Sequence, residues 1–174
     1  MKRLLAALFT LILFSASNLI SNRVEAKPTH ALVPGSADAE VQRIYQALPK
    51  FVEESLKSSE VKFNVIEIYI LGKMGSYFKE EFWAYPEILF KSEKTEPGFF
   101  LVDGKVQYAV TGLDTGYPIY LNADLIVDAD GKLRSEITSS FLIALLVHEL
   151  GHHQGIKECE YLQTLGEKVA LTVK

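Results

Sequence analysis

The chain has 174 residues, of which 48% are hydrophobic and 23% are charged, with 18 basic and 22 acidic side chains. This length and composition predict one globular domain whose core is large enough to fold without a disulfide framework or a structural metal. The net charge of −4 and the scattered lysines and arginines exclude an electrostatic surface for nucleic acid. The chain has one cysteine, Cys159, which excludes an intramolecular disulfide.

The first 26 residues are typical of a secretory signal peptide. Lys2 and Arg3 precede an apolar run over residues 4–14, and Val24 and Ala26 suit signal peptidase. The apolar run is shorter than the ~20 residues that span a bilayer, which disfavours a retained membrane anchor. We therefore expect cleavage after Ala26 and a secreted or periplasmic mature chain without a membrane segment. Its net charge would be −6, because residues 1–26 carry three basic side chains and one acidic side chain.

The mature chain predicts an irregular tail at residues 27–35, followed by one α+β domain over residues 36–174. Ser36 is a suitable N-cap for a helix over residues 36–56, in which apolar residues recur at helical spacing and Pro49 predicts a kink or a break. We expect this helix to pack behind a twisted mixed sheet of about four strands.

Strands are predicted where β-branched and aromatic side chains are dense. Residues 61–71 predict a buried strand, and residues 99–110 predict a hairpin that turns at Asp103-Gly104. Residues 117–127 predict one or two further strands, and residues 128–131 predict a polar turn. The aromatic stretch at residues 75–97 is left unassigned.

A strongly apolar helix is predicted over residues 135–153, with Ser135 as its N-cap. It contains His148-Glu149-Leu150-Gly151-His152, which matches the motif H-E-x-x-H. Residues four apart lie on one face of a helix, so His148 and His152 can bind one metal ion together. Glu149 lies beside this face, where its carboxylate can reach a water on the metal without binding the metal itself.

The motif and the residues after it resemble the zincin metallopeptidases. The sequence from His148 to Glu158 follows the metzincin-like pattern H-E-x-x-H-x-x-G-x-x-(H or D), with Gly155 at the glycine that ends the helix and turns the chain. Position 158 departs from this pattern because it is Glu158. A second departure is that the methionine-containing turn of the metzincins has no counterpart, since the methionines are Met1 and Met74.

The resemblance implies a zincin-like fold and a zinc-dependent peptidase. Zinc would be held by His148, His152 and Glu158, and Glu149 would act as general base in the hydrolysis of a peptide bond. Residues 117–125 resemble the edge strand against which an extended peptide or protein substrate docks. We expect a monomeric enzyme.

Several alternatives stay open at the level of the sequence. Cys159, Glu160 and Glu167 compete with Glu158 for the role of third ligand. His153 points off the ligand face and is a second-shell or substrate-facing group. Tyr161, Tyr120 and His153 are candidates to stabilise the oxyanion. The alternative functions are a non-catalytic periplasmic zinc-binding protein and an interaction module. A final helix over residues 158–171 would close the core.

Overall fold

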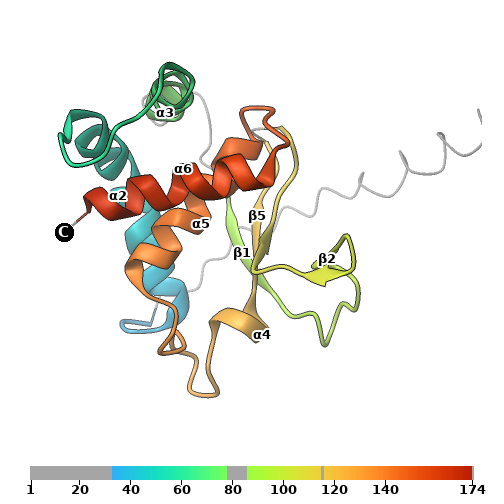
Figure 1. Ribbon diagram of the computed structural model, residues 1–174. Helices are drawn as coiled ribbons and strands as arrows, with labels where there is room; N and C mark the ends of the chain where they lie inside the picture. Colours follow the sequence, from blue (N-terminus) through green and yellow to red (C-terminus); the bar gives the residue numbers. More distant parts are fainter. Residues whose placement is uncertain (1–32, 78–85, 115, 174) are drawn as a thin grey trace, which may run out of the picture. The chain divides into compact units, whose positions relative to one another are not determined.

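The fold combines helices with two small sheets, which confirms the α+β class. A computed structural model describes residues 33–77, 86–114 and 116–173 (Figure 1). The helices are α2 (Ala37–Lys57), α3 (Val65–Tyr77), α4 (Ala123–Ile126), α5 (Ser139–His152) and α6 (Cys159–Thr172). The strands are β1 (Ile88–Lys91), β2 (Leu101–Val102), β3 (Lys105–Val106), β4 (Ala109–Val110) and β5 (Ile119–Asn122). The predicted signal peptide, residues 1–26, lies outside the described residues, as do residues 78–85 of the unassigned aromatic stretch.

The larger sheet is mixed and has the strand order β1-β5-β4. β1 runs parallel to β5 with Ile88 opposite Ile119, and β4 runs antiparallel to β5 with Ala109 opposite Leu121. The prediction that residues 117–125 form the edge strand is wrong, because β5 has a partner strand on each side. β4 forms an edge of this sheet instead.

The chain leaves β5 through a short helix and not through a second strand. The Asn122 side chain caps α4 by accepting a hydrogen bond from the Asp124 amide at 3.1 Å. Its amide group also donates to the Gln107 carbonyl at 3.1 Å, which holds the end of β5 against the segment before β4. The Asn122 side chain therefore bonds both to the start of α4 and to Gln107, and β5 ends earlier than the sequence pattern predicts.

The hairpin predicted over residues 99–110 is confirmed around its turn at Asp103-Gly104, whereas residues 109–110 form β4 and pair with β5. β2 and β3 pair antiparallel with Val102 opposite Lys105. Asp103 and Gly104 have φ angles of 50° and 76°, the left-handed values that a tight two-residue hairpin turn requires.

The predicted buried strand at residues 61–71 is wrong, because most of this segment belongs to helix α3. Asn64 and Glu67 form a reciprocal capping box: the Asn64 Oδ1 accepts from the Glu67 amide at 2.9 Å, and the Glu67 carboxylate accepts from the Asn64 amide at 2.7 Å. These two bonds satisfy amides at the start of the helix, and they outweigh the β-propensity of the isoleucines. The helix buries Ile70, Leu71 and Met74, while Val65, at 83% exposure, points to solvent.

Helix α2 begins where the sequence predicts, since the Ser36 hydroxyl accepts a hydrogen bond from the Ala39 amide at 3.2 Å. The helix continues through Pro49 to Lys57. It packs against α3, α5 and α6 and not behind the sheet as we expect from the sequence, because α5 and α6 supply the apolar surface that it buries.

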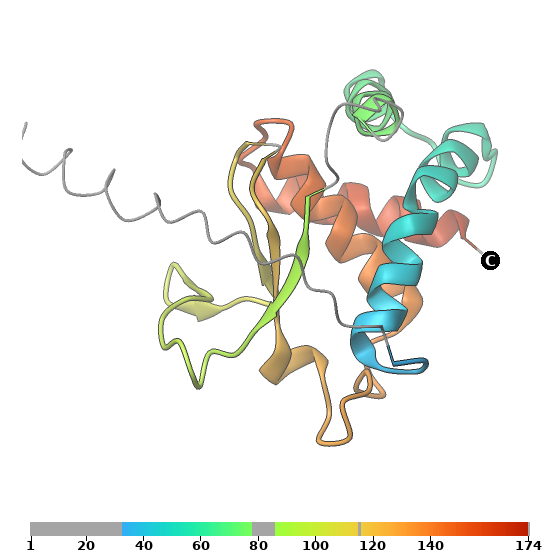
Figure 2. The same cartoon turned by 180° about the vertical axis from the view of Figure 1, so that it is seen from behind.

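Helices α5 and α6 lie side by side and form the centre of the core (Figures 1 and 2). α5 begins three residues later than predicted, with Thr138 as N-cap, whose hydroxyl accepts from the Phe141 amide at 3.1 Å. The two helices approach so closely that a Cβ on Gly166 would lie 2.3 Å from the Ala144 carbonyl oxygen. This close contact holds α6 against α5, and Cys159 is the first residue of α6.

None of the described helices is long and apolar enough to span a membrane.

Candidate metal centre

The motif helix presents one face to an open cleft. This cleft has a volume of about 860 Å³ and lies between three walls: α5, the start of α6, and the segment around β4 with the nearby hairpin. Phe141, Leu145, His148, Glu149 and His152 line it from α5, which is the spacing of a single helical face. His148, Glu149 and His152 therefore line one accessible cleft.

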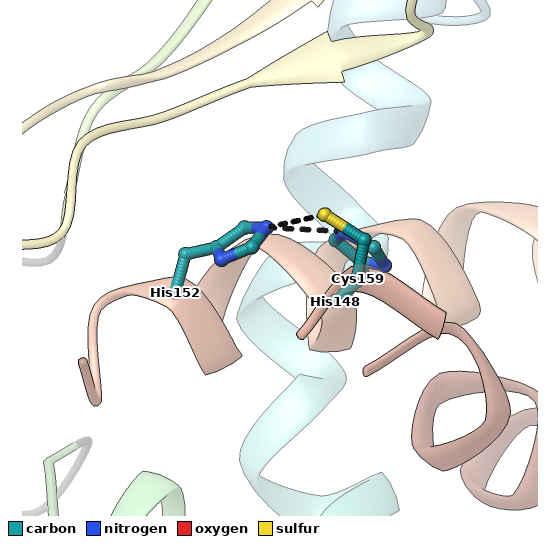
Figure 3. A group of neighbouring side chains, drawn as sticks. All are labelled: His148, His152 and Cys159. Carbon is teal, nitrogen blue, oxygen red and sulfur yellow. Dashed lines mark hydrogen bonds between the residues drawn. The ribbon is translucent and has the colours of Figure 1, made fainter. Parts of the chain in front are cut away.

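His148 and His152 project side by side from α5, and Cys159 reaches them from the start of α6 (Figure 3). The two Nε2 atoms are 3.2 Å apart, and the Cys159 Sγ lies 3.9 Å from the Nε2 of His152. Of the described histidine, cysteine and carboxylate side chains, these three form the group whose ligand atoms lie within 4.8 Å of one another.

The spacing fits a tetrahedral zinc ion. With Zn–N distances of 2.0–2.1 Å and a Zn–S distance near 2.3 Å, two nitrogens would lie about 3.3 Å apart, and a nitrogen and a sulfur about 3.6 Å apart. Two observed separations, 3.2 Å between the nitrogens and 3.9 Å between the Cys159 Sγ and the His152 Nε2, are close to these values, and all three ligand atoms lie within 4.8 Å of one another. Imidazole nitrogen and thiolate sulfur are also the donor types that zinc prefers.

The hydrogen bond on the other side of His152 sets the protonation of its ring. The Nδ1 atom lies 2.7 Å from the Ile156 carbonyl oxygen, which only accepts, so Nδ1 carries the proton. In the neutral ring Nε2 then presents its lone pair to the cluster, which is the arrangement that supports metal-binding histidines. Gly155, with φ of 80°, makes the turn that brings the Ile156 carbonyl back to the ring.

His148 and Glu149 are both held in their uncharged forms by burial when no metal is bound. Burial, and next the positive charge of His152, lower the pKa of the His148 imidazole to about 4. Burial raises the pKa of the Glu149 carboxyl, which is 4% exposed, to about 8. The Nδ1 of His148 is buried without a hydrogen-bond partner among the described residues. A cation in the cleft would relieve the burial cost of the Glu149 carboxylate, which supports a metal in this place.

The structure brings together two of the three predicted ligands. Glu158 is the N-cap of α6, and its carboxylate accepts a hydrogen bond from the Lys157 amide at 3.2 Å. It does not belong to the described group of three ligand atoms, in which Cys159 occupies the third place. Zinc ligation by Glu158 stays a prediction.

The other candidates for the third ligand lie apart from the cluster. Glu160 lines the cleft one residue after Cys159. The Glu167 carboxylate, two turns along α6, accepts a hydrogen bond from Gln163 at 2.8 Å. Neither carboxylate belongs to the described metal-binding group.

The residues named for oxyanion stabilisation do not line the cleft. Tyr120 stacks edge-on against Phe99 with ring centroids 5.0 Å apart. His153 is 4% exposed, and its Nε2 lies 2.6 Å from the Thr111 Oγ1. Burial, and next the charge of His152, lower the pKa of the His153 imidazole to about 4. The donors that do line the cleft include Tyr108 and Lys157, which the sequence pattern does not distinguish from other exposed polar residues.

Comparisons of the chain with protein-family models, with curated proteins and with solved structures find no match.

Proposed function

We propose that residues 36–174 form a zinc-dependent metallopeptidase that hydrolyses peptide bonds. One observation carries the proposal: two histidine Nε2 atoms 3.2 Å apart, a cysteine Sγ 3.9 Å from one of them, and a buried glutamate from the same helix share a single open cleft. His148, His152 and Cys159 would hold the metal, which leaves a fourth tetrahedral position for water or substrate. Secretion of this enzyme is a further prediction, which rests on residues 1–26.

Bound zinc would lower the pKa of a water molecule to about 7 and polarise the scissile carbonyl group. Glu149 would take the proton of the attacking water and return it to the leaving amine. Burial holds the pKa of the Glu149 carboxyl at about 8 in the metal-free protein, and the charge of a bound cation would lower this pKa, so that the carboxylate form needed to accept a proton becomes available near neutral pH.

The strand β4 supports a peptide as the substrate. β4 is an edge strand, and Gln107, Tyr108, Ala109, Val110 and Thr111 line the cleft along it. An edge strand offers unpaired backbone groups, to which an extended peptide can add as a further strand. The cleft walls also include the apolar side chains of Phe141 and Leu145, which favour apolar side chains of the substrate.

The test is a comparison of the mature chain with its Glu149→Gln variant. We expect the wild type to bind about one zinc ion per chain and to cleave members of a fluorogenic peptide library. Glu149→Gln should keep the zinc and lose turnover by about 10²- to 10⁴-fold, which is the range for a general base. A Glu149→Gln variant with wild-type turnover, or a wild type that cleaves no peptide in the library, would contradict the proposal.

A non-catalytic zinc-binding protein is the second candidate, and the thiol of Cys159 favours it, since cysteine is common in structural zinc sites. Structural sites close the coordination shell with four protein ligands, whereas the described residues bring three together. X-ray absorption of the zinc-loaded protein would separate the two functions. A water oxygen in the first coordination shell supports the enzyme, and a fourth protein ligand supports the structural site.

A further inference from the structure

A chain of partly buried hydrogen bonds joins the motif helix to the strand on the opposite side of the cleft. The Thr111 Oγ1 lies 2.9 Å from the Pro118 carbonyl oxygen and 2.6 Å from the Nε2 of His153. The carbonyl only accepts, so the Thr111 hydroxyl donates to it, and the hydroxyl oxygen accepts from the Nε2–H of His153. Every proton in the chain His153–Thr111–Pro118 is therefore assigned.

The three residues lie at the ends of the elements that form the site. His153 is the C-cap of α5 and directly follows His152. Thr111 directly follows β4 and lines the cleft, while Pro118 directly precedes β5. Between α5 with its C-cap and the described sheet with its flanking residues, the bond from His153 to Thr111 is the one hydrogen bond. It is therefore the polar contact that links the metal-binding end of α5 to the end of β4, whereas the start of α5 contacts the same segment through the rings of Phe141 and Tyr108, whose centroids lie 5.0 Å apart.

We propose that His153 and Thr111 are a positioning pair. Their hydrogen bond sets the distance between the β4 backbone and the metal centre, and so aligns the substrate peptide with the metal. This inference rests on the proposed function, since it concerns a peptide that docks on β4. Neither residue contacts the reacting atoms. The pair acts through the strand, so its loss should weaken the binding of an extended peptide more than it affects the metal.

The experiment uses Thr111→Val, which keeps the shape of the side chain and removes the hydroxyl, with Thr111→Ser as the matched control that keeps it. Each protein is measured for zinc content, for the affinity of acetohydroxamic acid, and for kcat and KM with a hexapeptide substrate. Acetohydroxamic acid binds the metal alone and is too small to reach along β4.

For Thr111→Val we expect one zinc per chain, an acetohydroxamic acid affinity within about twofold of the wild type, and a KM raised about tenfold or more with a smaller change in kcat. Thr111→Ser should restore the wild-type KM. An unchanged KM in Thr111→Val, or an equal loss of acetohydroxamic acid affinity, would overturn the inference, because the bond would then support the fold or the metal site alone.

A second pair of variants covers the case in which Thr111→Val does not fold. His153→Gln keeps an N–H donor near the position of Nε2, and His153→Phe keeps a ring without a donor. We expect a raised KM in His153→Phe and a near-normal KM in His153→Gln, and equal KM values would overturn the inference. Failure of the proposed function is distinguishable, since it appears as a wild type that binds no zinc or cleaves no peptide.

Discussion

Glu67 and Glu149 lie near opposite ends of α6 and are equally buried, but among the described residues only Glu67 has a cationic partner. Glu67, 3% exposed, accepts hydrogen bonds from the Asn64 amide and from the Lys168 ammonium group, which lies 2.7 Å from its carboxylate. Glu149, 4% exposed, lines the cleft beside the two motif histidines, and burial alone raises the pKa of its carboxyl to about 8. Among the described residues no cation forms an ion pair with Glu149.

The two residues differ in whether the fold compensates for the burial of the carboxylate. A buried carboxylate is costly unless a cation or hydrogen-bond donors compensate for the lost water. At Glu67 the fold itself supplies the compensation, which ties α3 to α6. At Glu149 the fold supplies none within the described chain, so the residue lowers the stability of the metal-free protein, which is typical of a carboxylate at a functional site.

The largest expected effect is on the pH dependence of stability in the metal-free protein. The pKa of Glu149 is near 4.5 in the unfolded chain and about 8 in the folded chain, so between these values the folded state holds a proton that the unfolded state has lost. The free energy of unfolding therefore falls as pH rises from 4.5 to 8. Glu149→Gln removes this loss and should raise the free energy of unfolding at pH 8 by on the order of 4 kcal/mol, with little change at pH 4.5.

Urea unfolding in the presence of EDTA at pH 4.5, 6.5 and 8 measures this difference. The low pKa values of His148 and His153 have the opposite effect. They lower the free energy of unfolding as pH falls from 6.5 to 4, because the unfolded chain then binds protons that the folded chain does not. The difference between wild type and Glu149→Gln largely cancels these contributions. A difference that does not grow with pH would contradict the pKa assigned to Glu149.

The motif segment shows how far local sequence chemistry predicts the site. H-E-x-x-H places His148, Glu149 and His152 from helical spacing alone, and Gly155 predicts the turn, which its φ of 80° confirms. The third member of the cluster depends on where α6 begins after that turn. A shift of one residue exchanges Glu158 for Cys159, and the position of α6 along α5 depends on tertiary contacts that no local pattern encodes, such as the close approach of Gly166 to the Ala144 carbonyl oxygen.

The helix α3 shows the opposite limit of sequence patterns. Its β-branched residues predict a strand, although Asn64 followed three residues later by Glu67 is also a helix-start signal. The reciprocal capping bonds of Asn64 and Glu67 favour the helix, and the ion pair of Glu67 with Lys168, which is 101 residues away in the chain, adds a tertiary contact that the local pattern does not contain. The prediction that residues 117–125 form the edge strand fails for a similar reason. The central position of β5 follows from its pairing with β1, which is distant in the chain, and not from its composition.

The second largest effect that we expect is on the zinc affinity of the candidate metal centre at the start of α6. Cys159→Ala should weaken zinc binding by about 10²-fold or more, or about 2.7 kcal/mol, because it removes one of three ligands. Glu158→Ala should change the affinity by less than about threefold, since its carboxylate is bonded to the Lys157 amide. Competition with a chromophoric chelator measures both constants. The reverse order of effects would restore Glu158 as the third ligand.

Glu67 lies on α3 and contacts Lys168 near the C-terminal end of α6. We expect Glu67→Gln to lower the free energy of unfolding by about 2 kcal/mol. The substitution breaks a charged hydrogen bond to Lys168 and leaves the ammonium group without its partner. Peptidase activity should stay within about twofold of the wild type, because the residue lies outside the cleft. The comparison of the two glutamates would fail if Glu67→Gln lost activity without losing stability.

The smallest expected effect is the pairwise coupling between Glu67 and Lys168. Lys168 keeps 30% of its side chain exposed, so water screens part of the attraction, and a double-mutant cycle with Glu67→Gln and Lys168→Met should give a coupling free energy of about 1 kcal/mol. Most of the loss in Glu67→Gln would then come from the ammonium group left without a carboxylate, because a glutamine side chain still accepts the capping hydrogen bond from the Asn64 amide. Urea unfolding of the four proteins at 0.1 M and 1 M salt measures the coupling. A value near zero at both salt concentrations would show that Glu67 is held by the backbone amide of Asn64 and not by the lysine, and compensation by a cation would then no longer distinguish it from Glu149.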